Sequence, residues 1–130
     1  MEEPMAAAVQ DSVTYSVALA GAAIVPGPGD DDGTGTAQVT FVPAQGQVCY
    51  EITVEGVGDV TAVHIHTGSA GESGAPVLDL NVPANGLSGC VGDVTGDLLA
   101  QIQANPSAYY VNVHTNEFGG GAVRGQLAES

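Results

Sequence analysis

Apolar and polar residues alternate with a period of two along most of this chain, which is the pattern of half-buried β-strands. The alternation runs through residues 12–20, 36–42, 47–55, 61–67, 77–82, 86–91, 109–115 and 122–128. Turns rich in Gly, Pro or Asp separate these segments. We therefore predict an all-β fold, an antiparallel β-sandwich or Greek-key-like barrel.

One segment follows a helical period instead. Between Thr95, a candidate N-cap, and the stop signal Asn105-Pro106, apolar residues recur at positions i, i+1 and i+4. This spacing places them on one face of a helix. We predict one short helix near residues 96–104.

The length and the ends of the chain indicate its organisation. A chain of 130 residues is normally one domain, so we predict a single β domain over residues 12–128, preceded by a flexible N-terminal segment, residues 1–11. No run is long and apolar enough to cross a membrane. The first residues lack the basic start and apolar middle of a signal peptide, so we expect none in this chain.

The charge is strongly acidic, with 15 acidic residues against one basic residue and a formal net charge of −14. Phosphate binding needs Lys and Arg, so nucleic acids and anionic membranes are excluded as partners. The acidity fits a saline habitat or ordinary extracellular acidity, and it attracts cations. The run Asp30-Asp31-Asp32 lacks the spaced ligands of an EF-hand, which favours weak cation attraction over a defined calcium site.

All three histidines of the chain lie in two predicted strands. Side chains two residues apart share one face of a strand, so His64 and His66 point the same way. On the second strand His114 shares its face with Tyr110 and Asn112. The intervening valines and isoleucine take the opposite faces and mark the core side. If the two strands lie close together in the sheet, the three imidazoles can converge on one point outside the core.

Three neutral imidazoles suit Cu(II) or Zn(II), and the Irving–Williams order favours copper, with zinc as the alternative. Three protein ligands also leave one coordination position open. A metal-bound imidazole normally donates its other N–H to a second group. Candidates for that group, or for a fourth ligand, are Tyr110 and Asn112 beside His114, and Glu72 and Glu117 in the loops after each motif. The alternative is that the histidines are structural, or form a pH-sensitive patch.

Three further residues have two interpretations each. Arg124 is the only cation of the chain; it could orient an anion beside the metal, or be a structural arginine bonded to carboxylates or carbonyls. Cys49 and Cys90 could form one disulfide in an oxidising compartment, or be two unrelated buried thiols. A bridge over about 40 residues would stabilise the fold by about 4 kcal/mol in the chain-entropy model.

Several stretches together resemble the CHRD domain, a repeat of chordin that is also common in bacterial secreted proteins. They are Ala18-Leu19-Ala20-Gly21, residues 33–35, His64-Ile65-His66-Thr67-Gly68, Tyr110-Val111-Asn112-Val113-His114-Thr115 and Arg124-Gly125-Gln126-Leu127. The resemblance covers residues 12–127. It implies a β-sandwich in an extracytoplasmic protein, secreted or periplasmic, and it supports the pairing of Cys49 with Cys90.

The candidate site is similar, at a few positions only, to the copper site of copper–zinc superoxide dismutase. That enzyme also has a strand His-x-His, a later strand His and a downstream Arg. There the histidines bind copper and the Arg guides the anionic substrate. The long loop that carries the zinc ligands of the enzyme has no counterpart in this chain.

These observations lead to three functional hypotheses. The first is an extracytoplasmic copper-binding CHRD-domain protein that uses His64, His66 and His114 on the outer face of a sheet for copper capture or delivery. The second is a superoxide dismutase-like copper redox enzyme, with Arg124 near the metal. The third is a metal-free module that binds another secreted protein. Whether there is catalysis, and the oligomeric state, stay open at this stage.

Overall fold

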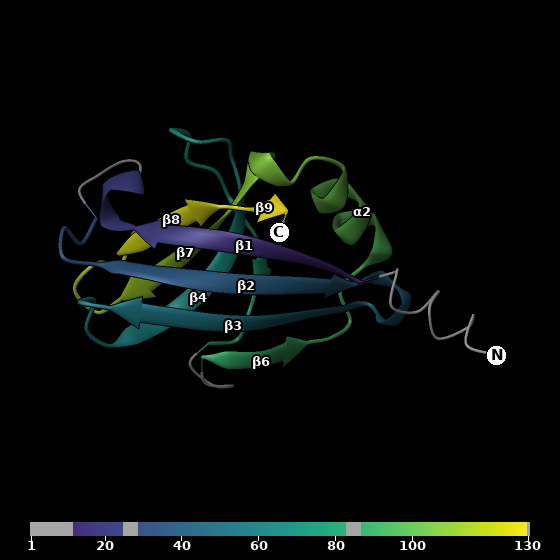
Figure 1. Cartoon of the computed structure of the whole chain (residues 1–130), viewed down its shortest axis with the longest axis horizontal. Helices are drawn as coiled ribbons and strands as arrows, with labels where there is room; N and C mark the ends of the chain where they lie inside the picture. The colour runs from purple at the N-terminus through teal and green to yellow at the C-terminus, as the bar shows by residue number, and fades with distance from the viewer. Residues whose placement is uncertain (1–11, 25–28, 83–86, 130) are drawn as a thin grey trace.

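A computed structural model describes residues 12–24, 29–82 and 87–129, so the predicted flexible segment 1–11 lies outside the described residues. The described chain forms one antiparallel sheet in the order β5-β4-β7-β8-β1-β2-β3-β6, with β9 paired to β1 (Figure 1). The strands are β1 (Val13–Ala20), β2 (Thr34–Val42), β3 (Gln47–Glu55), β4 (Val60–Thr67), β5 (Pro76–Asp79), β6 (Ser88–Val91), β7 (Tyr109–Thr115), β8 (Val123–Gln126) and β9 (Ala128–Glu129).

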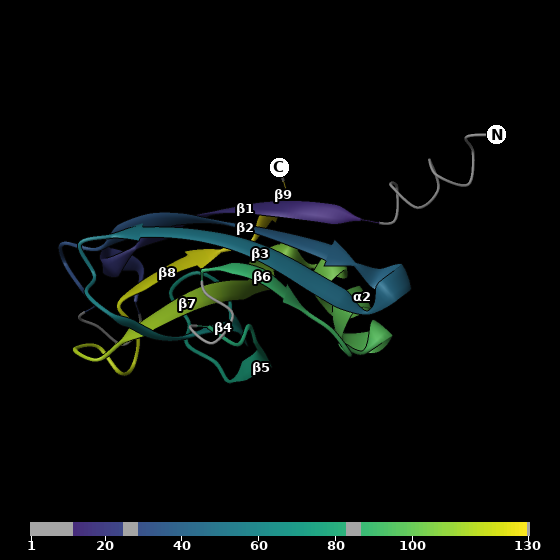
Figure 2. The same cartoon turned by 90° about the horizontal axis from the view of Figure 1, so that it is seen from below.

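The sheet curls into a half-barrel. Figure 2 shows β1, β2 and β3 as an upper layer, with β7 and β4 below them, and β8 leads from one layer to the other. The prediction of an all-β antiparallel fold with one short helix is confirmed. A single curled sheet forms both layers, so the two halves face each other across a shared core.

The inner face of the curled sheet holds the apolar residues of the alternating pattern. On β4 and β7, the side chains that alternate with the outward-facing residues are fully buried: Val63, Ile65, Val111 and Val113 are each 0% exposed. β-Branched side chains pack well on a pleated surface, which is why these segments form strands. The same core includes Tyr15, Leu19, Val39, Phe41, Ile52, Leu80, Leu99, Ile102, Val123 and Leu127. The histidines therefore project from the opposite, outer face, as the alternation predicted.

The predicted helix is α2 (Gly96–Ala104), at the end of the molecule away from the turn between β7 and β8 (Figures 1 and 2). The Thr95 side chain accepts a hydrogen bond from the Leu98 N–H at 3.3 Å, which satisfies one of the unpaired donors of the first turn. Leu99 and Ile102 face the core. Among the described residues, no helix has the length and apolar composition needed to cross a bilayer.

Cys49 and Cys90 form a disulfide, as predicted. They lie directly opposite each other on the antiparallel pair of β3 and β6, and β6 is one edge of the sheet. The bridge therefore attaches a four-residue edge strand to its neighbour. Such a bond suggests an oxidising compartment.

The predicted closing strand, residues 122–128, is interrupted in the structure. β8 and β9 are separate strands with Leu127 between them. The Leu127 N–H donates to the Tyr109 carbonyl at 3.1 Å, and the Leu127 side chain is 1% exposed. The inward Leu127 side chain agrees with the alternation. The break occurs where the paired register with β7 ends and the chain continues beside β1, and the local sequence pattern does not indicate such a change of partner.

Candidate metal centre

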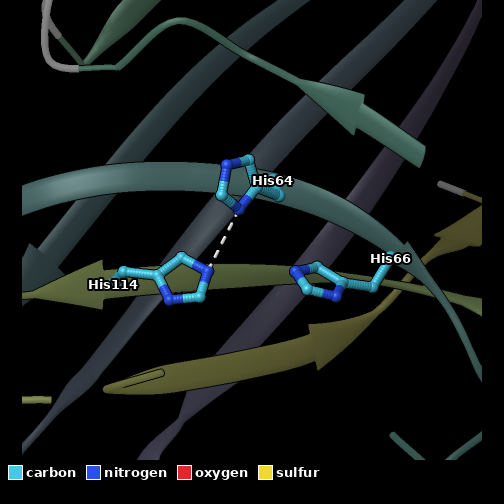
Figure 3. Close-up of side chains that lie close together, drawn as sticks. All are labelled: His64, His66 and His114. Carbon is cyan, nitrogen blue, oxygen red and sulfur yellow. Dashed lines mark hydrogen bonds between the residues drawn. The ribbon is translucent and has the colours of Figure 1, made fainter. Parts of the chain in front are cut away.

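The strands β4 and β7 are hydrogen-bonded neighbours, which brings the two histidine motifs together. In their antiparallel register His66 lies opposite Tyr110, His64 opposite Asn112 and Ala62 opposite His114. His114 is thus displaced by two residue pairs from His64, which is the next position on the same face of the sheet. Cross-strand and diagonal neighbours on one face are within reach of ring side chains. The three imidazoles accordingly point toward one another (Figure 3).

The three rings form a compact cluster. Their ring centroids are 4.9 Å apart for His64 and His114, 5.7 Å for His64 and His66, and 5.9 Å for His66 and His114. One nitrogen from each ring lies within 4.8 Å of the others, so the cluster could hold a metal ion. His64 Nδ1 and His114 Nε2 are 3.1 Å apart. The predicted convergence of the three histidines is therefore present in the structure.

Two carbonyl groups fix which nitrogen of two rings carries the proton. His66 Nδ1 lies 2.9 Å from the Gly74 carbonyl oxygen, and His114 Nδ1 lies 3.0 Å from that of Gly119. A carbonyl can only accept a hydrogen bond, so in both neutral rings Nδ1 carries the proton and donates it. The lone pair of each ring is then on Nε2. This arrangement is typical of metal-binding histidines, whose other N–H bonds to a carbonyl or carboxylate.

The Nε2 atom of His66 is buried and, among the described residues, has no hydrogen-bond partner. The residue is only 7% exposed, so water does not readily replace that partner. An unsatisfied buried acceptor costs about 1–3 kcal/mol. A metal ion at the centre of the cluster would give this lone pair a partner.

The donor set fits an ion bound by three nitrogens. Imidazole nitrogens lie about 2.0–2.1 Å from zinc, which places two of them roughly 3–3.5 Å apart around one ion. In the metal-free structure His64 Nδ1 donates a hydrogen bond to His114 Nε2 at 3.1 Å, a distance that falls in the same range (Figure 3). The ligand atom that His66 offers lies within 4.8 Å of the other two. His64 would bind through Nδ1, so its own proton would lie on Nε2 in the bound form.

The environment favours neutral rings. Burial lowers the pKa of His66 and of His114. The hydrogen bonds to the Gly74 and Gly119 carbonyls act in the opposite direction. His64 lowers both pKa values further, together with Arg124 in the case of His66 and with His66 in the case of His114. Only the neutral imidazole offers a lone pair to a metal. The lowered pKa values keep two of the three rings in this form near neutral pH.

Tyr110 and Arg124 pack beside the cluster. The Tyr110 ring stacks on His66, with centroids 4.9 Å apart and an interplanar angle of 15°. The Arg124 Cζ lies 3.4 Å from the centroid of the same tyrosine ring, a cation–π contact. Because β4 and β8 flank β7 on opposite sides, the tyrosine ring lies between His66 and Arg124.

Arg124 has the contacts of a structural arginine. It is 2% exposed, and its Nη2 donates to the Ser69 carbonyl and to Gln126 Oε1, both at 2.9 Å. Burial lowers the pKa of the guanidinium, and Tyr110 and Glu72 partly offset this. Ser69 lies in the loop after the first histidine motif, so Nη2 attaches the arginine to this loop. The other terminal nitrogen, Nη1, is buried without a partner among the described residues.

The other predicted neighbours have different partners. Asn112 lies opposite His64, and its Nδ2 donates to the Gly120 carbonyl at 3.5 Å. Glu72 Oε1 accepts from the Ser69 N–H at 3.1 Å. Glu117 lines a separate hollow. The ring N–H groups of His66 and His114 donate instead to the carbonyls of Gly74 and Gly119, which the sequence did not predict. The only signal for them was a glycine-rich loop after each motif.

The acidic run Asp30-Asp31-Asp32 lines that separate hollow. Asp30 is 8% exposed, and one carboxylate oxygen accepts from the Asp32 N–H at 3.1 Å. Its backbone N–H donates to the Ala122 carbonyl at 2.9 Å. Both the carboxylate and the backbone N–H of Asp30 therefore have protein partners that stabilise the loop. Among the described residues, the side chains close enough to share one ion are the three histidines.

The fold and the site define an antiparallel β domain with a three-histidine cluster on its outer face. The family model of the CHRD domain matches residues 15–127. The chain belongs to the CHRD family. Comparisons with curated proteins and with solved structures gave no match.

Proposed function

We propose that this CHRD domain binds one copper ion through His64 Nδ1, His66 Nε2 and His114 Nε2, and that it serves in copper capture or delivery. The observation that carries the proposal is the buried Nε2 of His66, a lone pair without a partner among the described residues. Its proton is held at Nδ1 by the Gly74 carbonyl. The ring is thus oriented as a ligand before any ion arrives.

The chemistry of the donor set favours copper. All three donors are imidazole nitrogens, which suit Cu(II) and Zn(II). The Irving–Williams order ranks copper above zinc for such a site. Zinc is therefore the alternative ion, and direct competition between the two metals decides between them.

The surroundings of the cluster favour transfer of the ion over catalysis. His64 and His114 are only half-buried, so an ion held between them is accessible from solvent or from a partner protein. Arg124 is engaged by Ser69 and Gln126 and is separated from His66 by the Tyr110 ring. A net charge of −14 also repels the superoxide anion. These features weaken the hypothesis of a dismutase-like enzyme.

The compartment follows from the disulfide. Bonds such as Cys49–Cys90 persist in oxidising environments, so we propose that the protein acts outside the cytoplasm, secreted or periplasmic. Residues 12–128 would act there as one domain. The acidic surface would attract metal cations without binding any of them specifically.

Metal competition tests the proposal. The wild-type protein and a triple His64→Ala, His66→Ala, His114→Ala variant are exposed to equimolar copper and zinc, desalted, and analysed for metal. We expect one copper per wild-type chain, nitrogen hyperfine structure in electron paramagnetic resonance, and no retained metal in the folded triple variant. A site that retains zinc instead would contradict the choice of copper.

Two further outcomes separate the competing hypotheses. Superoxide dismutation by the copper-loaded protein beyond that of free copper would favour the enzyme. Failure of the folded wild-type protein to retain either metal would return the histidines to a structural role. The metal-free interaction module would then be the better hypothesis. Gln38→Ala, an exposed change on β2, is the matched control for the effect of substitution itself.

A further inference from the structure

The loop of residues 68–75 folds back over the outer face of β4 and β7. Its two ends are closed by backbone bonds, from the Thr67 N–H to the Ala75 carbonyl at 3.1 Å and from the Gly68 N–H to the Ala108 carbonyl at 2.7 Å. Gly68 has φ 146°, in the region that favours glycine. The loop carries the Gly74 carbonyl that accepts from His66.

Three side chains on the face below hold this loop. Arg124 Nη2 donates to the Ser69 carbonyl at 2.9 Å. Gln126 Nε2 donates to the Gly68 carbonyl at 3.0 Å. The Tyr110 hydroxyl accepts from the Gly74 N–H at 3.1 Å. In the register of β7 and β8, Tyr110 lies opposite Gln126, and Arg124, two residues before Gln126 and on the same face, lies opposite Asn112.

These three side chains are also bound to one another. Arg124 donates to Gln126 Oε1 at 2.9 Å and lies over the Tyr110 ring. The Tyr110 ring in turn stacks on His66. We call Tyr110, Arg124 and Gln126 the clamp. It touches His66 directly through the stack and indirectly through the Gly74 carbonyl.

Glycine at position 74 is required for the loop to lie this close. A Cβ built there would collide with the Thr67 carbonyl oxygen. The corresponding acceptor for His114 lies in a more open turn, because a Cβ on Gly119 would meet nothing within 4 Å among the described residues. The two carbonyl acceptors therefore differ in how tightly the surrounding chain holds them.

We propose that the clamp is a positioning device for the metal site. By holding loop 68–75 it keeps the Gly74 carbonyl on His66 Nδ1, which fixes the ring in the Nδ1–H tautomer with Nε2 facing the cluster. The purpose of this arrangement rests on the proposed copper function. The tautomer itself does not, because it follows from the metal-free geometry. Arg124 thus acts through the loop, as a positioning residue.

The tautomer can be measured without any metal. Nitrogen-15 NMR of the metal-free protein at mildly alkaline pH, where the rings are neutral, distinguishes Nδ1–H from Nε2–H. We expect His66 in the Nδ1–H form in the wild-type protein. Three changes should produce a mixture of tautomers at His66: Gly74→Ala, which displaces the acceptor, Tyr110→Phe, which removes the hydroxyl, and Arg124→Met, which removes the bond to the loop.

The matched control is Gly119→Ala, which has room for its methyl group and keeps its carbonyl. It should leave both His66 and His114 in the Nδ1–H form. In each clamp variant, an unchanged His114 signal shows that the fold is intact. Tyr110→Phe is the mildest of the three changes, so it keeps the test available if Gly74→Ala or Arg124→Met does not fold.

Copper affinity supplies the second readout. The folded clamp variants should bind copper about 10–100-fold more weakly than wild type, the range typical for loss of a group that orients a ligand. A His66 ring that stays Nδ1–H in folded Tyr110→Phe and Gly74→Ala would overturn the clamp. So would unchanged affinity in those variants. A wild-type protein with the expected tautomer but no copper binding would support the positioning and refute the copper function.

Discussion

The two halves of the curled sheet follow the same alternating pattern, but their outer faces differ. On β1 and β2 the outward side chains Ser16, Ala18, Thr36 and Gln38 are exposed. On β7 and β8 the corresponding residues are large, polar and buried: Tyr110 is 2% exposed, Asn112 5% and Arg124 2%. The difference is due to the loops after the histidine motifs. Loop 68–75 and the turn between β7 and β8 bond to this half of the sheet.

This comparison shows how a sheet face becomes a site. Exposed polar side chains have water as a partner, so they need no defined geometry. Buried polar side chains need protein partners, and those around the histidines each bond to one of the two loops through at least one polar atom. Three buried atoms here have no partner among the described residues, namely Asn112 Oδ1, Arg124 Nη1 and His66 Nε2. The last of these carries the lone pair that a metal ion in the cluster would use. The loops that cover the outer face thus hold the His66 and His114 rings through the Gly74 and Gly119 carbonyls.

The disulfide lies in the half of the sheet without the histidines, and its removal should change the free energy of unfolding more than any histidine substitution. Replacing Cys49 and Cys90 by Ser should lower the free energy of unfolding by about 2–5 kcal/mol, because the bridge no longer restricts the unfolded chain. Urea unfolding of the variant and of the oxidised wild type measures the difference. Copper affinity of the folded variant should not change, because the bridge lies in the other half. A variant as stable as the wild type would show that the bridge does not stabilise the fold. A folded variant that loses copper binding would show that the two halves are coupled.

Single histidine changes test the second half of the sheet. His64→Ala, His66→Ala and His114→Ala should each weaken copper binding by at least about 100-fold, since loss of a ligand exceeds loss of an orienting group. Chelator competition measures the affinity. His66→Ala should lower the stability of the metal-free protein by less than the burial of His66 would suggest. The substitution also removes an unsatisfied buried acceptor, which offsets part of the lost packing. A variant with wild-type affinity would remove that histidine from the proposed site.

The smallest expected effect is a pH dependence confined to the histidine half. Burial lowers the folded-state pKa of His66 and His114, so below about pH 6.5, the usual value for an unfolded histidine, the unfolded state binds more protons. Stability of the metal-free protein should therefore fall as the pH drops from that value toward the folded-state pKa values. Unfolding at a series of pH values measures it. The variant His66→Gln, His114→Gln should show a flatter profile over this window, and an equally steep one would assign the effect to other groups.

Much of the fold could be predicted because it depends on local patterns. Alternation identified the strands and their inner faces, and Thr95 and Asn105-Pro106 marked the helix ends. The pairing of Cys49 with Cys90 was also predicted, with support from the family resemblance. The split between β8 and β9 was missed, because the paired register with β7 ends there while the chain continues beside β1, and alternation places Leu127 inward without indicating which strand it pairs with.

For the candidate site, the alternation alone predicts which side chains share a face, because side-chain direction in a strand repeats every two residues. That period, together with the register of β4 and β7, places His64, His66 and His114 within reach of one another. Three features are visible only in the folded chain: the Gly74 and Gly119 carbonyls as acceptors, the tautomers they impose, and the burial of Arg124 against Tyr110. These contacts depend on how two glycine-rich loops fold back over the sheet, and backbone acceptors leave no residue-type signature in the sequence.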